Sequence, residues 1–156
     1  MTFLKKTVNQ MKNFKLLTLS LALALSVGLS STVMAQDFAI IVNSANSAAA
    51  DDSEIKNLFL KKKTTWSSGA EAVPFARPAD TPEHKAFIQN FLDFSQADLD
   101  NYWQAEKSKS GLTGPREVGS TNILTRQVSR KEGAFGIISA SDAGSLPDGV
   151  KVLKKF

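Results

Sequence analysis

The chain has 156 residues, contains no cysteine, and carries 19 lysines and arginines against 15 acidic residues, for a formal net charge of +4. Without cysteine it has no disulfide, no thiol nucleophile, no Cys-ligated zinc or iron–sulfur cluster, and no cysteine for lipid attachment. The length suits a single domain that is stabilised by an ordinary hydrophobic core.

The N-terminal segment has the pattern of a secretory signal peptide. Four lysines within the first fifteen residues precede an apolar run over residues 16–27, and the small residues Val33 and Ala35 follow at the spacing of a cleavage site. We expect residues 1–35 to be removed after Ala35 and the protein to act in the periplasm, without a stable membrane anchor after cleavage. Translation from Met11 in place of Met1 would shorten the leader and leave this expectation unchanged.

Cleavage changes what the charge implies. All four leader lysines lie in the segment that is removed, so residues 36–156 hold 15 basic and 15 acidic residues and are neutral overall. A neutral domain gives no reason to expect nucleic acid or an anionic membrane surface as a partner. We expect residues 36–156 to form one domain.

The start of that domain predicts two strands separated by a helix. Residues 37–43 are a short apolar run rich in β-branched side chains, which is typical of a buried strand. The helix that follows is expected to be capped at one of residues 51–53 and to be closed by the lysines at 61–63, which suit the negative end of the helix dipole. A second short strand is expected over residues 72–75.

Two helices follow in direct succession. Thr81 is expected to cap the first, with Pro82 in its first position, and Ser95 is expected to cap the second, over residues 96–107. The apolar stripe of the first helix consists of Phe87, Ile88, Phe91 and Leu92.

The last part of the chain predicts a brief strand over residues 116–118, a helix over residues 120–130, and strands over residues 134–139 and 150–153. The residues of this helix that are expected to face inward are Ile123, Leu124 and Val128. Strands that alternate with helices indicate an α/β domain, which we expect to contain a mixed sheet flanked by helices.

Side chains that commonly carry catalysis are scarce. His84 is the only histidine, and we expect it to be exposed in the first turn of its helix. No metal-ligand spacing or nucleophile–base pairing is found, so we expect no enzyme, no metal and no cofactor. Trp66, Tyr102 and Trp103 are expected to anchor the core, with stacking on a sugar as the alternative. The lysines at 61–63 could bind an anion, but a solvated helix end is the preferred interpretation.

The stretch from Arg77 to Glu83 is the strongest candidate for a binding site. It joins a strand to a helix N-terminus, which presents unpaired N–H groups and attracts anions. Arg77 could hold an oxyanion through two hydrogen bonds, and Thr81 adds a hydroxyl donor. Pro82 removes one N–H donor and Glu83 adds a negative charge, so a plain capped helix remains the alternative.

Three segments resemble, in the same order and with similar spacing, the phosphate ABC-transporter substrate-binding proteins. Residues 58–66, LFLKKKTTW, resemble the family's I-F-L-G-K-x-x-x-W stretch. Residues 73–77, VPFAR, resemble the strand that leads into its R-S-D-G-S-G-T phosphate loop, and residues 133–137, GAFGI, resemble its G-A-I-G-Y strand. The likeness covers most of residues 38–145, and full members of the family are about twice as long as this chain.

The resemblance implies a short form of the type II periplasmic-binding-protein fold, with inorganic phosphate or a similar oxyanion as ligand. It places that ligand at Arg77, which matches the family's arginine, at Thr81, which stands where a loop serine would be, and at Asp80. Pro82 and Glu83 replace the neighbouring glycine and threonine. A role in phosphate transport or sensing follows, with an ABC transporter or another envelope protein as partner. The alternative is a non-enzymatic envelope interaction module on the same scaffold with a decayed ligand site.

Overall fold

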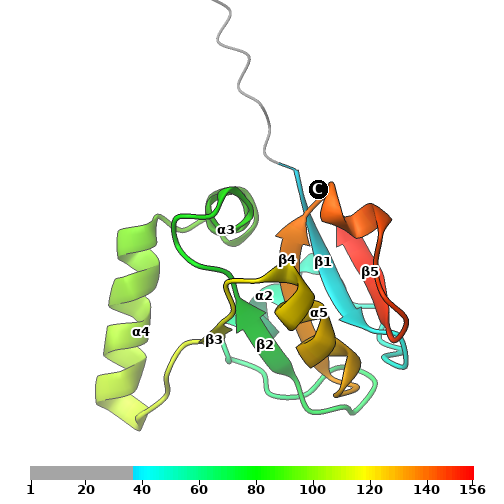
Figure 1. The fold of residues 1–156 in the computed structure, drawn as a ribbon. Helices are drawn as coiled ribbons and strands as arrows, with labels where there is room; N and C mark the ends of the chain where they lie inside the picture. Colours follow the sequence, from blue (N-terminus) through cyan, green and yellow to red (C-terminus); the bar gives the residue numbers. More distant parts are fainter. Residues whose placement is uncertain (1–36) are drawn as a thin grey trace, which may run out of the picture. The chain divides into compact units, whose positions relative to one another are not determined.

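The computed structural model describes residues 37–156, and the predicted signal peptide lies outside them. In chain order the elements are β1 (Phe38–Asn43), α2 (Asp52–Phe59), β2 (Val73–Ala76), α3 (Pro82–Ala86), the π-helix η1 (Phe87–Leu92), α4 (Gln96–Ser110), β3 (Arg116–Glu117), α5 (Thr121–Ser129), β4 (Ala134–Ser139), the 3-10 helix η2 (Asp142–Gly144) and β5 (Val150–Lys155) (Figure 1). The predicted succession of strands and helices is confirmed, with η2 added. Within these residues no helix is both long enough and apolar enough to cross a membrane.

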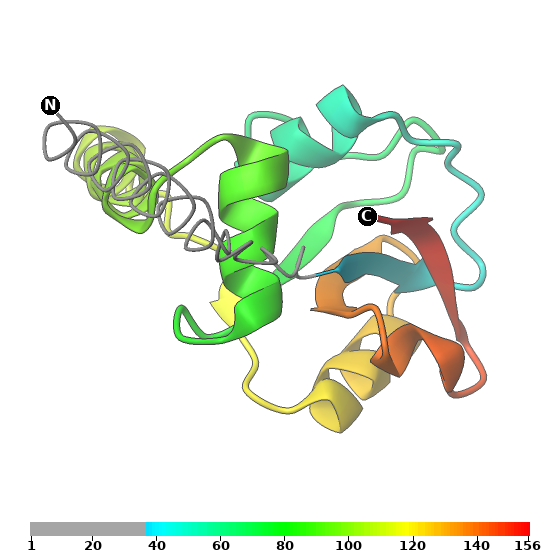
Figure 2. The same ribbon diagram turned by 90° about the horizontal axis from the view of Figure 1, so that it is seen from above.

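The five strands form one mixed sheet in the order β3-β2-β4-β1-β5. Strand β1 is antiparallel to its neighbours β4 and β5, whereas β2 is parallel to both β3 and β4. The helices α2 and α3 and the π-helix η1 pack on one face of the sheet, and α5 packs on the other face (Figure 2). The expected α/β class is therefore confirmed, and the sheet needs apolar side chains on both faces.

Strand β1 lies at the centre of the core, and all six of its residues are buried. Phe38, Ile40 and Val42 pack into the cluster formed with α2, α3 and η1, whereas Ala39 and Ile41 pack into the cluster under α5. Successive side chains of a strand point to opposite faces of the sheet. The continuous apolar run is therefore what a strand between two helical layers requires.

Trp66 anchors the segment between α2 and β2, as the sequence predicts. Its side chain is 2% exposed, its Nε1 donates a hydrogen bond to the carbonyl oxygen of Gly133 at 2.8 Å, and its ring packs edge-on against Phe135. The hydrogen bond satisfies the one polar atom of the buried indole. Tyr102 and Trp103 are half-buried and join α4 to the same cluster.

Two helices end at other positions than predicted. Helix α2 stops at Phe59, and the lysines at 61–63 lie beyond it, because Lys61 adopts a left-handed backbone conformation with φ of 53°. Helix α4 starts at its predicted cap, Ser95, with a complete capping box. It continues past the predicted end to Ser110 and is terminated by Gly111, whose φ is 73°.

The helical segment after Pro82 changes from one turn of α-helix to the π-helix η1. The pattern of the sequence does not predict this change. The apolar stripe is nevertheless confirmed, because its four residues are all buried: Phe87, Ile88, Phe91 and Leu92. Single π-helical turns are rare and frequently occur near functional sites.

Helix α5 buries two of the three residues that were predicted to face inward. Leu124 and Val128 are buried as expected, but Ile123 is 48% exposed, so its predicted inward position is wrong. Thr125 is buried in its place. Leu124 packs closely against Gly136 of β4, where a Cβ would lie 2.9 Å from a methyl carbon of Leu124. The missing side chain on β4 therefore leaves room for Leu124.

Gly133 allows a direct test of the packing between β2 and β4. A Cβ at this position would lie 1.8 Å from the carbonyl oxygen of Glu71, so Gly133→Ala must displace the backbone beside β2. We expect this variant to lower the free energy of unfolding by about 2–3 kcal/mol in urea denaturation. Gly144→Ala is the matched control, because no atom would lie within 4 Å of its Cβ. Equal stabilities of the two variants would contradict the described packing.

Candidate functional site

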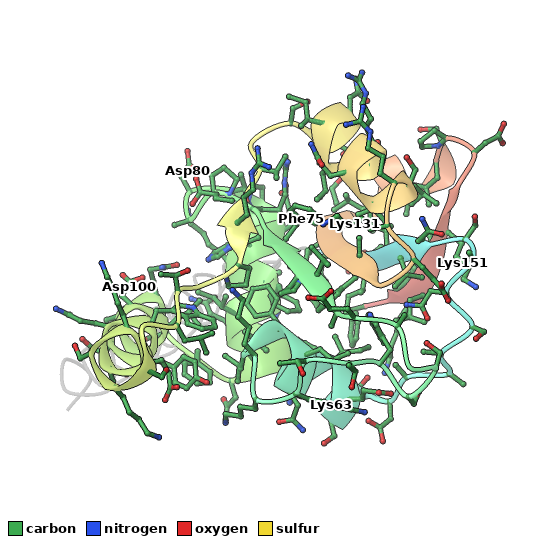
Figure 3. The ribbon with its side chains drawn as sticks, turned by 90° about the horizontal axis from the view of Figure 1, so that it is seen from below. Lys63, Phe75, Asp80, Asp100, Lys131 and Lys151 are labelled. Atoms are coloured by element: carbon green, nitrogen blue, oxygen red, sulfur yellow. The ribbon has the colours of Figure 1, made fainter. Side chains whose placement is uncertain are left out.

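The candidate oxyanion site is the loop between β2 and α3. Arg77 directly follows β2, and Thr81 directly precedes α3. Because β2 is parallel to both of its neighbours, the loop lies at the carboxyl end of these strands, where open α/β sheets commonly bind ligands. Asp80 lies at the outer side of this loop (Figure 3). The structure thus places the three predicted site residues in one short segment.

Arg77 lies inside the protein and holds two internal hydrogen bonds. Its side chain donates from Nε to Oε1 of Glu83 at 2.8 Å and from Nη1 to the carbonyl oxygen of Val118 at 2.8 Å. Arg77 and Glu83 are 6% and 7% exposed. A buried charge is costly unless a partner neutralises it, and Glu83 supplies that partner. The sequence analysis expects the positive charge of Arg77 to bind an anion. In the structure, the carboxylate of Glu83 already balances that charge.

The sequence analysis notes Glu83 as an unfavourable charge and does not foresee its pairing with Arg77. It also does not identify Val118 as a hydrogen-bond partner of Arg77. The N–H of Val118 donates to the carbonyl oxygen of Ala76 at 2.9 Å, which holds the segment after β3 against the end of β2. This contact places the carbonyl oxygen of Val118 within hydrogen-bonding distance of Arg77. An arginine and a glutamate six residues apart across a strand-to-helix loop are the one signal that could have indicated the pair.

Thr81 has the backbone conformation of a helix cap, with φ of −73° and ψ of 143°, but its side chain does not cap α3. Its Oγ1 instead donates to the carbonyl oxygen of Pro78 at 2.8 Å, which closes the loop on itself. The predicted side-chain cap is therefore wrong, although the predicted start of the helix at Pro82 is confirmed. Asp80 is exposed, and among the described residues no hydrogen bond or ion pair of its carboxylate is found.

His84 is buried, which contradicts the predicted surface position. Its side chain is 4% exposed, and Nε2 lies 3.0 Å from Oε1 of Gln96 at the start of α4. Nδ1 is buried without a hydrogen-bond partner among the described residues. The prediction fails because α3 continues into η1, which buries four apolar side chains, and Gln96 at the start of α4 contacts the imidazole. Within residues 37–156 no cluster of three or more His, Asp or Glu side chains could hold a metal ion.

Comparison with known proteins supports the fold. No model of a protein family and no curated protein matches the chain. Among solved structures it is similar to an ABC-type phosphate transport receptor from Vibrio cholerae, with 17% identity over 76% of this chain and 46% of the other, and a TM-score of 0.55.

Two further solved structures give the same result. A substrate-binding protein of the phosphate ABC-transporter type from Clostridium perfringens, with bound phosphate, has 20% identity over 77% of this chain and 46% of the other, and a TM-score of 0.57. PstS from Borrelia burgdorferi has 13% identity over 76% of this chain and 47% of the other, and a TM-score of 0.55. The chain thus spans slightly less than half the length of these proteins. The resemblance to phosphate ABC-transporter substrate-binding proteins is confirmed at the level of the fold.

The pair of Arg77 and Glu83 makes a testable contribution to stability. We expect Arg77→Met to lower the free energy of unfolding by about 3–5 kcal/mol, because it leaves the Glu83 carboxylate buried and unpaired. The double variant Arg77→Met with Glu83→Leu should regain most of this loss in chemical denaturation, since it removes both charges.

The exposed pair of Lys154 and Asp52 provides the control for this experiment. Its disruption by Lys154→Met should cost less than about 1 kcal/mol. A double variant that is as unstable as Arg77→Met would show that the ion pair is not what stabilises this loop.

Proposed function

From the likeness in fold to phosphate ABC-transporter substrate-binding proteins, we propose that this chain is an exported, non-enzymatic oxyanion-binding protein. Residues 36–156 form the mature periplasmic domain after removal of the leader, and phosphate is the favoured ligand. The observation that carries the proposal is the position of Arg77 at the carboxyl end of β2, in a fold shared with proteins that bind phosphate. The partner would be an ABC transporter or a sensor of the envelope.

The proposed site uses the three residues of the loop in different ways. The hydrogen bonds of Arg77 to described residues use Nε and Nη1, so we expect the oxyanion to be held through Nη2. The hydroxyl of Thr81 would turn from Pro78 to the ligand. The exposed carboxylate of Asp80 would accept a hydrogen bond from a protonated oxyanion such as hydrogen phosphate, and would repel fully ionised sulfate.

Glu83 sets the strength of this binding. Its carboxylate already neutralises Arg77, and an anion that approaches the same guanidinium must overcome that pairing. Residues 37–156 contain one five-stranded sheet, so no second lobe within these residues closes over the ligand. We therefore expect weaker binding than a site enclosed between two lobes would give, because less of the ligand is removed from water.

Calorimetry with inorganic phosphate and the variant Glu83→Gln tests this proposal. Glutamine keeps an oxygen that can accept the hydrogen bond from Nε of Arg77 but removes the competing negative charge. We expect Glu83→Gln to tighten phosphate binding about tenfold, which corresponds to about 1.4 kcal/mol. Glu54→Gln removes a carboxylate of another ion pair and should leave phosphate binding unchanged. Absence of phosphate binding by both the wild type and Glu83→Gln at millimolar concentration would refute the proposal.

The second candidate function is an envelope interaction module with a decayed ligand site. The same contact favours it, since a carboxylate of the chain occupies the guanidinium that a ligand would need. Here we expect a protein partner that is cross-linked to the exported chain and is retained when Arg77→Met and Glu83→Leu are combined. The measurement is mass spectrometry of cross-linked complexes from periplasm. Loss of the partner in the double variant, with the fold intact by circular dichroism, would argue against this function.

A further inference from the structure

A cavity of about 620 Å³ lies along the outer edge of β2, away from the loop of Arg77. We call it the β2 cavity. Its floor is formed by residues 72–75, and its walls come from the turn after α2, from β3 and from the C-terminal end of α5. Lys131, at the end of α5, is labelled beside Phe75 in Figure 3. Strand β3 pairs with β2 only at Phe75 and Ala76, so the earlier part of β2 is left open to this cavity.

The charge around the β2 cavity is strongly positive. Its lining includes four basic side chains, Lys61, Arg116, Arg130 and Lys131, against one carboxylate, Glu71, which leaves a formal charge of +3. The ion pairs found among residues 37–156 are those of Lys63, Arg77 and Lys154, so none of the four cations is paired with a carboxylate. Four cations that face one carboxylate repel one another in sum, and a bound anion relieves that repulsion.

Lys61 is held in position by the backbone. Its Nζ donates to the carbonyl oxygens of Thr113 and Gly114 at 2.7 and 3.3 Å, across the chain from α2 to the segment before β3. Its left-handed backbone conformation, with φ of 53°, is unusual for a residue with a side chain. Partial burial lowers the pKa of the Lys61 amine, as expected for a cation that is removed from water without a carboxylate beside it.

The surroundings of the β2 cavity favour a compact ligand over a protein strand or an acidic protein surface. Pro74 lacks an N–H group at the open edge, which prevents a peptide from continuing the sheet there. Acidic residues follow two of the cations directly, Glu117 after Arg116 and Glu132 after Lys131. A broad acidic surface would meet these carboxylates, whereas a small anion within the cavity would meet the cations.

We propose that the β2 cavity binds a small polyanion that carries two or three linked phosphate groups. The volume lies within the range of small-molecule sites, and the forked donors of Arg116 and Arg130 match the oxygens of phosphate. A chain of two or three phosphate groups carries about three or more negative charges near neutral pH and balances the +3 of the lining, whereas a single orthophosphate carries at most about two. The partly buried side chain of Val73 in the floor adds an apolar surface for the base of a nucleotide, so the phosphate chain is either inorganic or part of a nucleoside di- or triphosphate. The site is separate from Arg77.

Calorimetry with inorganic tripolyphosphate, ATP and orthophosphate, each without metal, tests the proposal. We expect saturable one-to-one binding of tripolyphosphate that is at least about tenfold tighter than that of orthophosphate and weakens with added salt. Tighter binding of ATP than of tripolyphosphate would assign the nucleotide form, and equal binding would assign the inorganic chain. The proposal would be overturned if neither tripolyphosphate nor ATP bound saturably at millimolar concentration.

Two arginines of the same region provide the matched pair of variants. Arg130→Gln should weaken tripolyphosphate binding about tenfold, as expected for the loss of a charge-assisted contact. Arg126→Gln removes the same charge from an exposed arginine of α5 that lines a different hollow, and should change the affinity less than about twofold. Equal effects of the two variants would mean nonspecific attraction and would overturn the proposal.

Chemical-shift mapping by NMR locates the bound probe and separates this proposal from the proposed function. Tripolyphosphate should shift the amide signals of residues 71–73, Phe75 and residues 127–131, and Glu83→Gln should leave its affinity unchanged. Shifts confined to Arg77 and residues 79–81 would assign the ligand to the loop of Arg77 and would overturn the proposal. If orthophosphate does not bind at Arg77, the expected chemical shifts and the expected affinity for tripolyphosphate stay the same.

Discussion

Burial of β1 on both faces is the constraint on which the rest of the fold depends. A strand that places Phe38, Ile40 and Val42 on one side and Ala39 and Ile41 on the other is stable only between two apolar layers. Helix α2, α3 and η1 provide one layer and α5 provides the other. The last strand, β5, then pairs along the free edge of β1, so the end of the described chain closes over its beginning. Every later element has to fit around this strand.

The same layering decides the electrostatics of the two anion sites. Arg77 leaves β2 into the interior, where its charge must be neutralised, and Glu83 neutralises it at 2.8 Å. The β2 cavity, in contrast to the buried Arg77, lies at the surface. It follows an edge of β2 that the two-residue strand β3 covers only in part. Three of its cations, Arg116, Arg130 and Lys131, are exposed and need no partner to keep the fold stable. One site is thus internally balanced, and the other retains its charge for a ligand.

Features that depend on neighbouring residues could be predicted from the sequence, because caps and apolar spacing act over one or two helical turns. The Ser95 cap and the start of α3 at Pro82 belong to this group. Two features that depend on a distant segment were predicted wrongly. The packing of α5 involves Gly136 in the next strand, and the burial of His84 involves α4.

The sequence by itself determined the α/β order of elements, the core strands and the segment that carries the candidate site, because apolar periodicity and turn residues are local properties. It also indicated the relationship in fold that the solved structures support. Only the tertiary structure decided which charges meet. The pairing of Arg77 with Glu83, and the gathering of Lys61, Arg116, Arg130 and Lys131 around one cavity, arise when segments far apart in the chain pack on the same sheet. Charge in a protein acts through space, and the spacing of residues along a chain does not reveal it.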